Sequence, residues 1–201
     1  MAVEVLNLFS VPVMVTELEG GLTEQEIAFL EKQEMRRNVG NLMSVDDYIL
    51  ENTELSRLKN WFLEQLDYYK TNIMGADIEM YITQSWTSLN PKGAWFHQHN
   101  HVNSIVSGTF YLQADKDSPY FVLHRPKNEF VYNFHPKEYN IFNSQLIKIP
   151  VSTNKLILFP SQLEHHVDAN QTEMDRISLA FNSFFKGRIG DRDSLNELIL
   201  K

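Results

Sequence analysis

The spacing of apolar residues changes near residue 75, and this change separates a helical part of the chain from a part built of strands. Between residues 53 and 69, apolar side chains recur every three or four positions, which predicts an amphipathic helix. After Gly75, Ile78, Met80 and Ile82 alternate with polar residues, which predicts a half-buried strand that runs toward Trp86. The apolar residues of the predicted helix are Leu55, Leu58, Phe62 and Leu66.

An earlier helix is predicted near residue 23. Thr23 is followed three positions later by Glu26, a pattern typical of a capping box at a helix N-terminus. Ile27, Leu30 and Met35 then supply an apolar face at helical spacing. The first third of the chain is therefore expected to be mainly helical.

The remaining two thirds read as short strands separated by Gly, Pro, Asn and Asp turns. This order predicts a mainly β fold with N-terminal helices, a β-sandwich or jelly roll whose helices pack on one outer face. The loop over residues 126–140 is long, polar and rich in aromatic residues, so it is a candidate lid. The predicted strands cover residues 105–112, 120–124, 145–149, 155–159 and 176–185.

Composition narrows the class of protein. With 201 residues, 43% hydrophobic and 22% charged, the chain falls among ordinary globular proteins of one domain. The lack of cysteine excludes thiol nucleophiles, zinc–thiolate sites and iron–sulfur clusters. The net charge of -8 disfavours nucleic acid or an anionic membrane as a partner. Without a signal-peptide pattern or a long apolar stretch, we expect a cytoplasmic protein that does not bind membranes.

The candidate chemistry lies in the histidines, most of which fall in two short blocks. His97, His99 and His101 are spaced by two residues, so on an extended segment they share one side, and two of them can hold one ion. A third imidazole from a distant strand would complete a facial triad that leaves positions open for substrate and oxygen. Such a cysteine-free site suits Fe(II), Zn, Ni or Cu. The alternative is that these histidines lie on the surface or are hydrogen-bonded in the core.

The second block contains His165 and His166, and strand alternation distinguishes them. His165 shares a face with Leu163 and Val167, whereas His166 shares the opposite face with two carboxylates. We therefore expect His165 to point inward and His166 to be a surface imidazole.

The segment after the second block alternates small or polar residues with large apolar ones. Its polar face should line a cavity while its apolar face packs on the helices. An arginine in a cavity needs an anion, and its planar fork fits a carboxylate, to which Ser178 can donate a second hydrogen bond. The alternative is a structural ion pair of the arginine with Asp168 or Asp175. The polar face carries Arg176, Ser178, Ala180 and Asn182.

Two long stretches resemble a known family. Residues 85–112, with the pattern HxHxNSxxSGxxYL, and residues 156–182, with FPSxLxHxV and RxSxxFN, are similar to the small family of 2-oxoglutarate-dependent Fe(II) oxygenases found in bacteria and phages. The resemblance covers residues 85–185, and the opening LFSVPV is also similar. It implies a double-stranded β-helix, which is a cupin-like jelly roll, over residues 76–186. Residues 1–75 would then be helical support, and residues 187–201 a tail or a short helix, all within one domain over 1–201.

The resemblance implies a function and a set of residues. Fe(II) would be held by His99, His101 and His165, which would be the catalytic centre. 2-Oxoglutarate would chelate the metal, with its distal carboxylate on Arg176 and Ser178, and O2 would complete the reactants. The expected reaction is hydroxylation of a C–H bond in a peptide or protein residue such as proline, or in a small molecule, with release of succinate and CO2. Further contacts to the cosubstrate or behind the metal ligands would come from Tyr111, Asn103 and Asn182.

One position departs from the wider superfamily, where the residue at position 101 would be Asp or Glu rather than His101. Either three histidines bind the metal, or His101 lies behind the ligands and a carboxylate from elsewhere or water takes its place. Three neutral imidazoles would let dianionic 2-oxoglutarate balance Fe(II), whereas a carboxylate ligand would leave one net negative charge. Both charges are compatible with binding, so the ligand set stays open.

Two other readings compete. A cupin-type metal enzyme without 2-oxoglutarate would explain the spacing of Gly93, His99 and His101, but it lacks the expected glutamate and gives Arg176 no purpose. A non-catalytic β-sandwich that binds a glycan or a protein is the alternative from another class, and it predicts a chain that does not retain metal.

Overall fold

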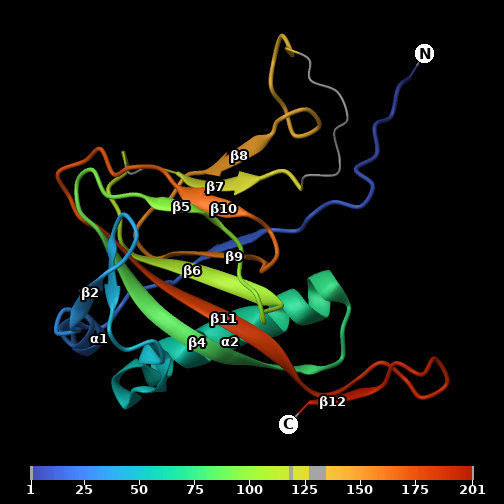
Figure 1. Ribbon diagram of the computed structural model, residues 1–201, viewed down its shortest axis with the longest axis horizontal. Helices are drawn as coiled ribbons and strands as arrows, with labels where there is room; N and C mark the ends of the chain where they lie inside the picture. Colours follow the sequence, from blue (N-terminus) through green and yellow to red (C-terminus); the bar gives the residue numbers. More distant parts are fainter. Residues whose placement is uncertain (1, 118–119, 127–134, 201) are drawn as a thin grey trace.

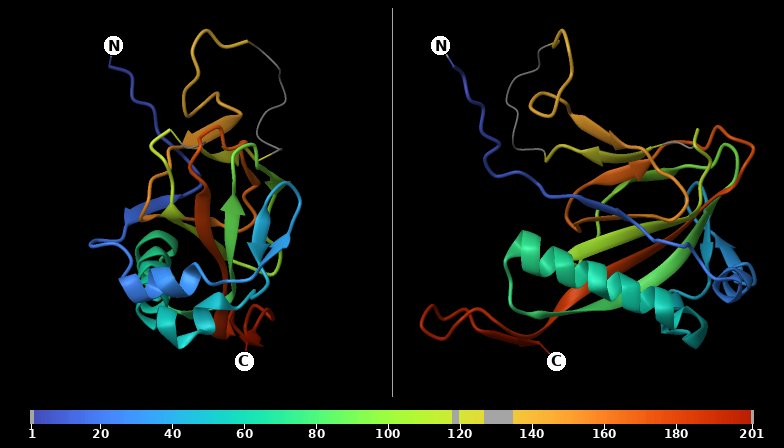
Figure 2. Two further views of the ribbon diagram at one scale, coloured as in Figure 1. Left: turned by 90° about the vertical axis from the view of Figure 1, so that its left-hand side faces the viewer. Right: turned by 180° about the vertical axis from the view of Figure 1, so that it is seen from behind.

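Two antiparallel sheets face each other, and a helix covers the outer side of the larger one (Figures 1 and 2). The computed structural model describes residues 2–117, 120–126 and 135–200. Each pair of neighbouring strands in this part of the chain is antiparallel. The mainly β, jelly-roll fold expected from the sequence is confirmed.

The larger sheet carries most of the long strands. Its path is β1 (Met14–Glu17), β9 (Lys155–Pro160), β6 (Val106–Gln113), β11 (Arg176–Ile189), β4 (Glu79–Asn90), β3 (Leu42–Ser44) and β2 (Met35–Arg37), and β12 (Leu198–Leu200) pairs with β11 beside this path. The smaller sheet runs in the order β5 (Phe96–His99), β10 (His165–Val167), β7 (Phe121–His124) and β8 (Leu146–Ile149).

Helix α2 (Ser56–Tyr68) packs its apolar stripe on the larger sheet, on the side away from the smaller sheet (Figure 2). The Phe62 ring lies 4.8 Å from that of Phe181 on β11 and 5.4 Å from that of Phe110 on β6. The helix predicted over 53–69 is confirmed; short 3-10 turns at Ile49–Glu51 and Thr53–Leu55 precede it, and a wider turn, Tyr69–Met74, follows it.

The capping box at Thr23 is also confirmed. Its Oγ1 accepts the N–H of Glu26 at 3.2 Å, and its own N–H donates to the Glu26 carboxylate at 2.8 Å. The helix it opens, α1 (Glu24–Leu30), is short, so Met35 does not lie on its face as expected. Met35 instead begins β2 and pairs with Ser44 of β3.

The first third of the chain is less helical than expected because it also contains β1, β2 and β3. These strands have only three or four residues, too few for an alternating pattern to stand out. β1 pairs with β9 and β3 with β4, both far along the chain, and β2 pairs with β3. The C-terminal residues form neither a free tail nor a helix, because Leu198–Leu200 pairs with β11. The candidate lid over 126–140 includes residues 127–134, which lie outside the described part.

One glycine of the resemblance is explained by packing. Gly108 lies in the middle of β6, and a Cβ at this position would come within 2.3 Å of Cζ of Phe181 and 2.9 Å of Cδ2 of Leu158. Any side chain there would displace a core residue. The glycine of the motif, Gly108, therefore lets β6 lie in close contact with the apolar face of β11.

Candidate metal centre

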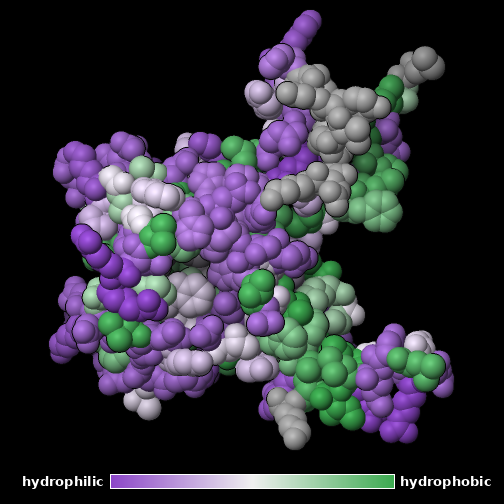
Figure 3. Space-filling view, in the orientation of Figure 1, coloured by the Kyte–Doolittle hydropathy of each residue, from purple (hydrophilic) through white to green (hydrophobic). Residues whose placement is uncertain are grey.

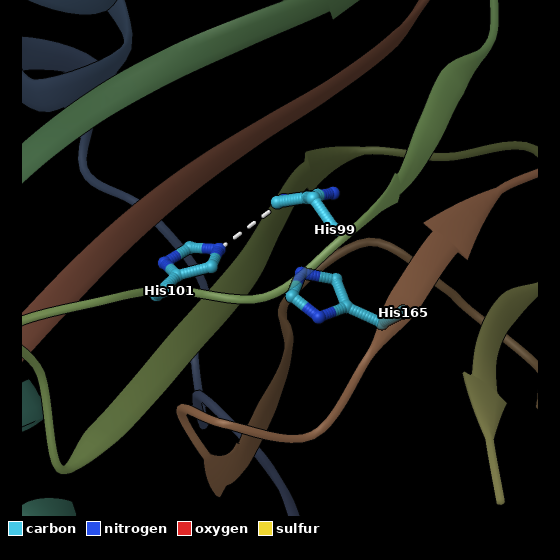
Figure 4. A group of neighbouring side chains, drawn as sticks. All are labelled: His99, His101 and His165. Atoms are coloured by element: carbon cyan, nitrogen blue, oxygen red, sulfur yellow. Dashed lines mark hydrogen bonds between the residues drawn. The ribbon is translucent and has the colours of Figure 1, made fainter. Parts of the chain in front are cut away.

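Three histidines converge between the two sheets. His99 ends β5 and His165 begins β10, and these two residues are direct partners in the antiparallel pair, so their side chains share one face. His101 follows in the next loop, where its N–H donates to the Ser161 carbonyl at 2.9 Å. One ligand atom from each ring lies within 4.8 Å of the others (Figure 4). This arrangement brings together two residues of the first histidine block and one of the second.

Each of the three rings is anchored through Nδ1. His99 Nδ1 donates to the His97 carbonyl at 2.8 Å, and His165 Nδ1 donates to the Leu163 carbonyl at 3.0 Å. The acceptor for His101 Nδ1 is a side chain, Oδ1 of Asn182. With the proton on Nδ1, the lone pair of every Nε2 is free, as a metal ligand requires. His99 Nε2 and His101 Nε2 lie 3.3 Å apart, a spacing that suits two ligands of one cation.

Burial keeps these rings neutral. Desolvation lowers the pKa of His99 to about 4 and that of His165 to about 2, and the neighbouring imidazoles act in the same direction. Desolvation also lowers the pKa of His101, against the opposing effect of its hydrogen bond to Asn182. All three are therefore neutral at neutral pH, and a metal ion does not have to displace a proton from Nε2.

The three histidines and Arg176 line the same small cavity. Its walls include the aromatic side chains of Trp86, Phe96, Phe121 and Phe159. The cavity has a volume of about 60 Å³, well under the ~300 Å³ of usual small-molecule sites, so a larger ligand can enter only if lining side chains move.

Arg176 is deeply buried without a carboxylate partner. Its side chain is 2% exposed, and its Nη1 makes no hydrogen bond with any described residue. Asp168 instead accepts hydrogen bonds from Lys148 and His166, each at 3.1 Å, so the structural ion pair with Arg176 is not formed. Desolvation lowers the pKa of Arg176, opposed by Tyr111 and Asp168. A buried cation with an unused donor is suited to an anionic ligand.

Strand β11 has the two faces expected from its alternation. Leu179 and Phe181 enter the core beneath α2, while Ser178 and Ala180 join Arg176 on the cavity side. In the sheet, Ser178 is flanked by Ser88 of β4 and Tyr111 of β6.

Tyr111, a candidate cosubstrate contact, also lines the cavity. It is buried, and desolvation raises its pKa to about 12 against the opposing charge of Arg176, so it carries a neutral hydroxyl. It thus offers a donor beside the unpartnered guanidinium.

Two candidate contacts lie elsewhere. Asn103 is exposed, is not among the residues that line the cavity, and has a left-handed backbone with φ of 54°, so it shapes the turn between His101 and β6. Asn182 meets the ring of His101 rather than the cavity. The cosubstrate contact considered for Asn103 is therefore not supported by its position.

The other two clustered histidines lie outside the triad. His97 is exposed and contributes its backbone carbonyl to His99. His166 faces away from His165, as expected, but it is half-buried and not a plain surface residue, because its ring bonds His124 at 2.6 Å and Asp168 at 3.1 Å.

Sequence reasoning missed several residues around the site. Trp86 stacks on His101 with ring centroids 5.8 Å apart, and two buried serines and one half-buried serine pack behind the same histidine. The serines are the S positions of the HxHxNSxxSG and FPS patterns, which were the available signal. They are Ser104, Ser107 and Ser161.

A larger groove of about 770 Å³ lies apart from the histidines. It is formed by residues 6–13, by β7 and β8, and by the segment that leads into β8. Apolar side chains also gather on the right-hand side of the space-filling view (Figure 3). The groove contains none of the triad, so the chemistry lies in the smaller cavity.

Two antiparallel sheets of a jelly roll enclose three neutral imidazoles and a buried arginine whose Nη1 has no partner among the described residues, an arrangement suited to a non-haem metal and an anionic ligand. In the sequence comparison, residues 84–182 match the family described as "Putative 2OG-Fe(II) oxygenase". This match agrees with the resemblance found in the sequence. The comparison with curated protein sequences gives no significant match. Among the described residues, no helix is long and apolar enough to span a membrane.

Several solved structures share this fold. A 2OG-Fe(II) oxygenase family oxidoreductase from Burkholderia pseudomallei has a TM-score of 0.57 at 13% identity and covers 78% of this chain and 74% of its own. HygX from Streptomyces hygroscopicus, bound to nickel, 2-oxoglutarate and hygromycin B, has a TM-score of 0.59 at 13% identity. The match covers 86% of this chain and 82% of HygX. A Pseudomonas putida prolyl-4-hydroxylase has a TM-score of 0.55 at 13% identity, and the match covers 89% of this chain and 94% of the hydroxylase. These similarities confirm the double-stranded β-helix.

Proposed function

We propose that this protein is an Fe(II)- and 2-oxoglutarate-dependent dioxygenase that hydroxylates a C–H bond of its substrate. The observation that carries the proposal is the pairing, in one cavity, of three free Nε2 atoms with a buried arginine whose Nη1 has no partner. The first feature suits a metal and the second a carboxylate. A metal-bound dicarboxylate satisfies both.

The metal ligands in this proposal are His99, His101 and His165. No carboxylate belongs to the group of candidate ligand atoms found among the described residues, which supports three histidines over a site with Asp or Glu. Imidazole nitrogen is a suitable donor for Fe(II), and a facial set of three leaves positions for other ligands. A neutral set also lets dianionic 2-oxoglutarate balance the charge of the metal.

The cosubstrate contacts proposed here are Arg176, Ser178 and Tyr111. The guanidinium can hold the distal carboxylate by two parallel hydrogen bonds, and the two hydroxyls lie on neighbouring strands in the same row of the sheet. Because Arg176 is buried, this pairing would be little screened by solvent.

When bound, Fe(II) with 2-oxoglutarate supplies the activation of O2 that couples formation of succinate and CO2 to oxidation of a substrate C–H bond. The chain's own residues orient these reactants and exclude water. Trp86, Phe96, Phe121 and Phe159 form apolar walls around the histidines, which strengthens electrostatic contacts within the cavity. Asn182 holds the proton of His101 on Nδ1, which keeps Nε2 directed at the metal.

The substrate class we propose is a peptide or protein residue such as proline, or a small molecule. The structures with this fold include a prolyl-4-hydroxylase, a protein with bound hygromycin B and the epimerase SnoN. The fold therefore serves more than one reaction, and the reaction type has to be established by product analysis.

The test is uncoupled turnover. With Fe(II), O2 and 2-oxoglutarate but no substrate, the purified protein should form succinate slowly, because oxygen activation needs only the metal and the cosubstrate. His165→Ala should abolish it, whereas His166→Ala, its neighbour on the opposite face, should retain it. Bound iron without any succinate would favour a cupin-type enzyme, and failure to bind iron would favour a non-catalytic module.

A further inference from the structure

A continuous chain of hydrogen bonds leads to the ring of His101. Ser104 Oγ lies 2.7 Å from Ser161 Oγ, which in turn lies 2.8 Å from Ser107 Oγ. Ser107 Oγ donates to Asn182 Oδ1 at 2.9 Å, and the same oxygen accepts the Nδ1–H of His101. The loop before β6, β6 itself, the turn after β9 and β11 all contribute to this chain.

The middle of the chain is closed to solvent. Ser107 and Ser161 have 0% exposed area, so water cannot replace a missing partner, and each hydroxyl has to donate within the network. Ser161 also fixes the backbone, because its carbonyl accepts the N–H of His101 at 2.9 Å and its N–H donates to Ile105 at 3.0 Å. The left-handed backbone conformation of Asn103 turns the polypeptide between His101 and Ser104, so that both residues can make these contacts.

The chain has a direction. Ser104 Oγ accepts the N–H of Ser183 at 3.3 Å, and its shortest contact is the one of 2.7 Å to Ser161; it also reaches the carbonyls of Ser183 at 3.2 Å and Val106 at 3.4 Å. Because Ser107 uses its proton on Asn182, the direction that satisfies both short serine contacts has Ser104 donating to Ser161. Ser161 then donates to Ser107, and Ser107 donates to Asn182. A hydroxyl that donates to the amide selects its oxygen, so Asn182 presents Oδ1 and not its NH2 group on this side.

This direction matters for His101 more than for the other two ligands. His99 and His165 donate to backbone carbonyls, which are always acceptors. His101 donates to a side-chain amide, which can rotate and present NH2 instead. That rotation would place the imidazole proton on Nε2 and remove the lone pair needed for the metal.

We propose that Ser107, Ser161 and Ser104 are positioning residues that act through Asn182 to hold His101 as the Nδ1–H tautomer. The purpose of this arrangement rests on the proposed metal site. The tautomer itself is a property of the metal-free protein, so it can be measured whether or not iron binds.

The first experiment compares two buried serines in the metal-free protein. Ser183 is the matched control, since it is also 0% exposed and adjoins Asn182, but its Oγ donates to the Val106 carbonyl at 2.6 Å, outside the chain. In 15N-histidine NMR at pH 8, His101 should be in the Nδ1–H form in the wild type and in Ser183→Ala. In Ser107→Ala, the Nε2–H form should appear.

A rescue variant tests the mechanism. Aspartate at position 182 offers an acceptor oxygen in either orientation, so the double variant Ser107→Ala/Asn182→Asp should return His101 to the Nδ1–H form. If the rescue fails, or if Ser183→Ala shifts the tautomer as far as Ser107→Ala does, the hydrogen bonds of the serines do not set the tautomer of His101 and the inference is wrong.

The second experiment measures Co(II) affinity by calorimetry and by visible absorption. Ser107→Ala should weaken binding about tenfold, the lower end of the usual effect of residues behind a metal ligand, and Ser161→Ala should weaken it less. Ser183→Ala should stay within about twofold. An unchanged affinity in Ser107→Ala would overturn the inference. A wild type that binds no Co(II) would contradict the proposed function, and the NMR result alone would then decide the inference.

Discussion

The two sheets differ both in how they are built and in what they carry. The larger sheet contains strands as long as β11, with 14 residues, and it is backed by α2, whereas β10 of the smaller sheet has three residues. Yet the smaller sheet supplies His99 and His165, and the larger sheet supplies Arg176 and Asn182. The larger, helix-backed sheet therefore holds the proposed anion contact, and the smaller sheet holds two of the three proposed metal ligands.

This division predicts that changes beneath the larger sheet affect stability, while changes in the smaller sheet affect ligand binding. The largest effect should come from Phe62→Ala, which removes a ring stacked between α2 and the sheet. We expect the free energy of unfolding to fall by about 3–5 kcal/mol. Urea unfolding measures it. Metal affinity should stay near that of the wild type; a parallel loss of both would mean that the two layers are not separable.

His165→Ala should have the opposite profile. Losing one of three ligands should weaken Co(II) binding by roughly a hundredfold or more, about 2.7 kcal/mol, with little change in the unfolding midpoint. Calorimetric titration of Co(II) checks this. His166→Ala is the control on the same strand and should bind normally. If His166→Ala loses the metal and His165→Ala keeps it, the assignment of faces on β10 is reversed.

Arg176→Ala tests the contribution of the larger sheet. A bidentate, buried ion pair contributes roughly 1.5–3 kcal/mol, so 2-oxoglutarate should bind the anaerobic or Ni(II) protein about tenfold to a hundredfold more weakly. Metal affinity should barely change. Arg176→Lys should recover part of the loss, because it keeps the charge without the fork. Arg188→Ala, an exposed change on the same strand, should have no effect. Equal 2-oxoglutarate affinity in Arg176→Ala and wild type would contradict the proposed carboxylate contact.

The smallest expected effect concerns pH and the N-terminal support. Burial raises the pKa of Glu26, but hydrogen bonds from Arg57 and Thr23 outweigh it and hold the pKa below its usual value. A lowered pKa in the folded state gives stability that is present above the unfolded pKa of about 4.3 and lost as the pH falls. Glu26→Gln keeps the capping box, so it should cost less than about 1 kcal/mol at pH 7 and reduce the loss of stability on acidification. Urea unfolding at pH 7 and pH 4 compares the two proteins, and identical acid profiles would contradict this role.

The sequence predicted the long elements and missed the short ones for a physical reason. Helix α2 and strand β4 span enough residues for a period of 3.6 or 2 to emerge, and both were expected. Strands β1, β2 and β3 have no such pattern. β1 and β3 form because β9 and β4, far away in the chain, offer them backbone partners, and β2 then pairs with β3.

The site could be predicted where alternation determines it. The inward face of His165 and the cavity face of Arg176 both follow from the pleat of their strands. The position of Asn103 could not be predicted in this way, because its left-handed backbone breaks the alternation after His101. The serine chain also could not be predicted, since it depends on the register that joins β6 to β9 and β11.

The unpartnered guanidinium of Arg176 has a consequence for the lifetime of the protein. A buried guanidinium with an unsatisfied Nη1 destabilises the native state, and a dicarboxylate that binds only the folded chain shifts the balance back. At a concentration one hundred times its dissociation constant, such a ligand adds about 2.7 kcal/mol to the free energy of unfolding. Starvation for 2-oxoglutarate should therefore make this chain more susceptible to proteolysis as well as idle, so that its abundance follows the supply of its own cosubstrate.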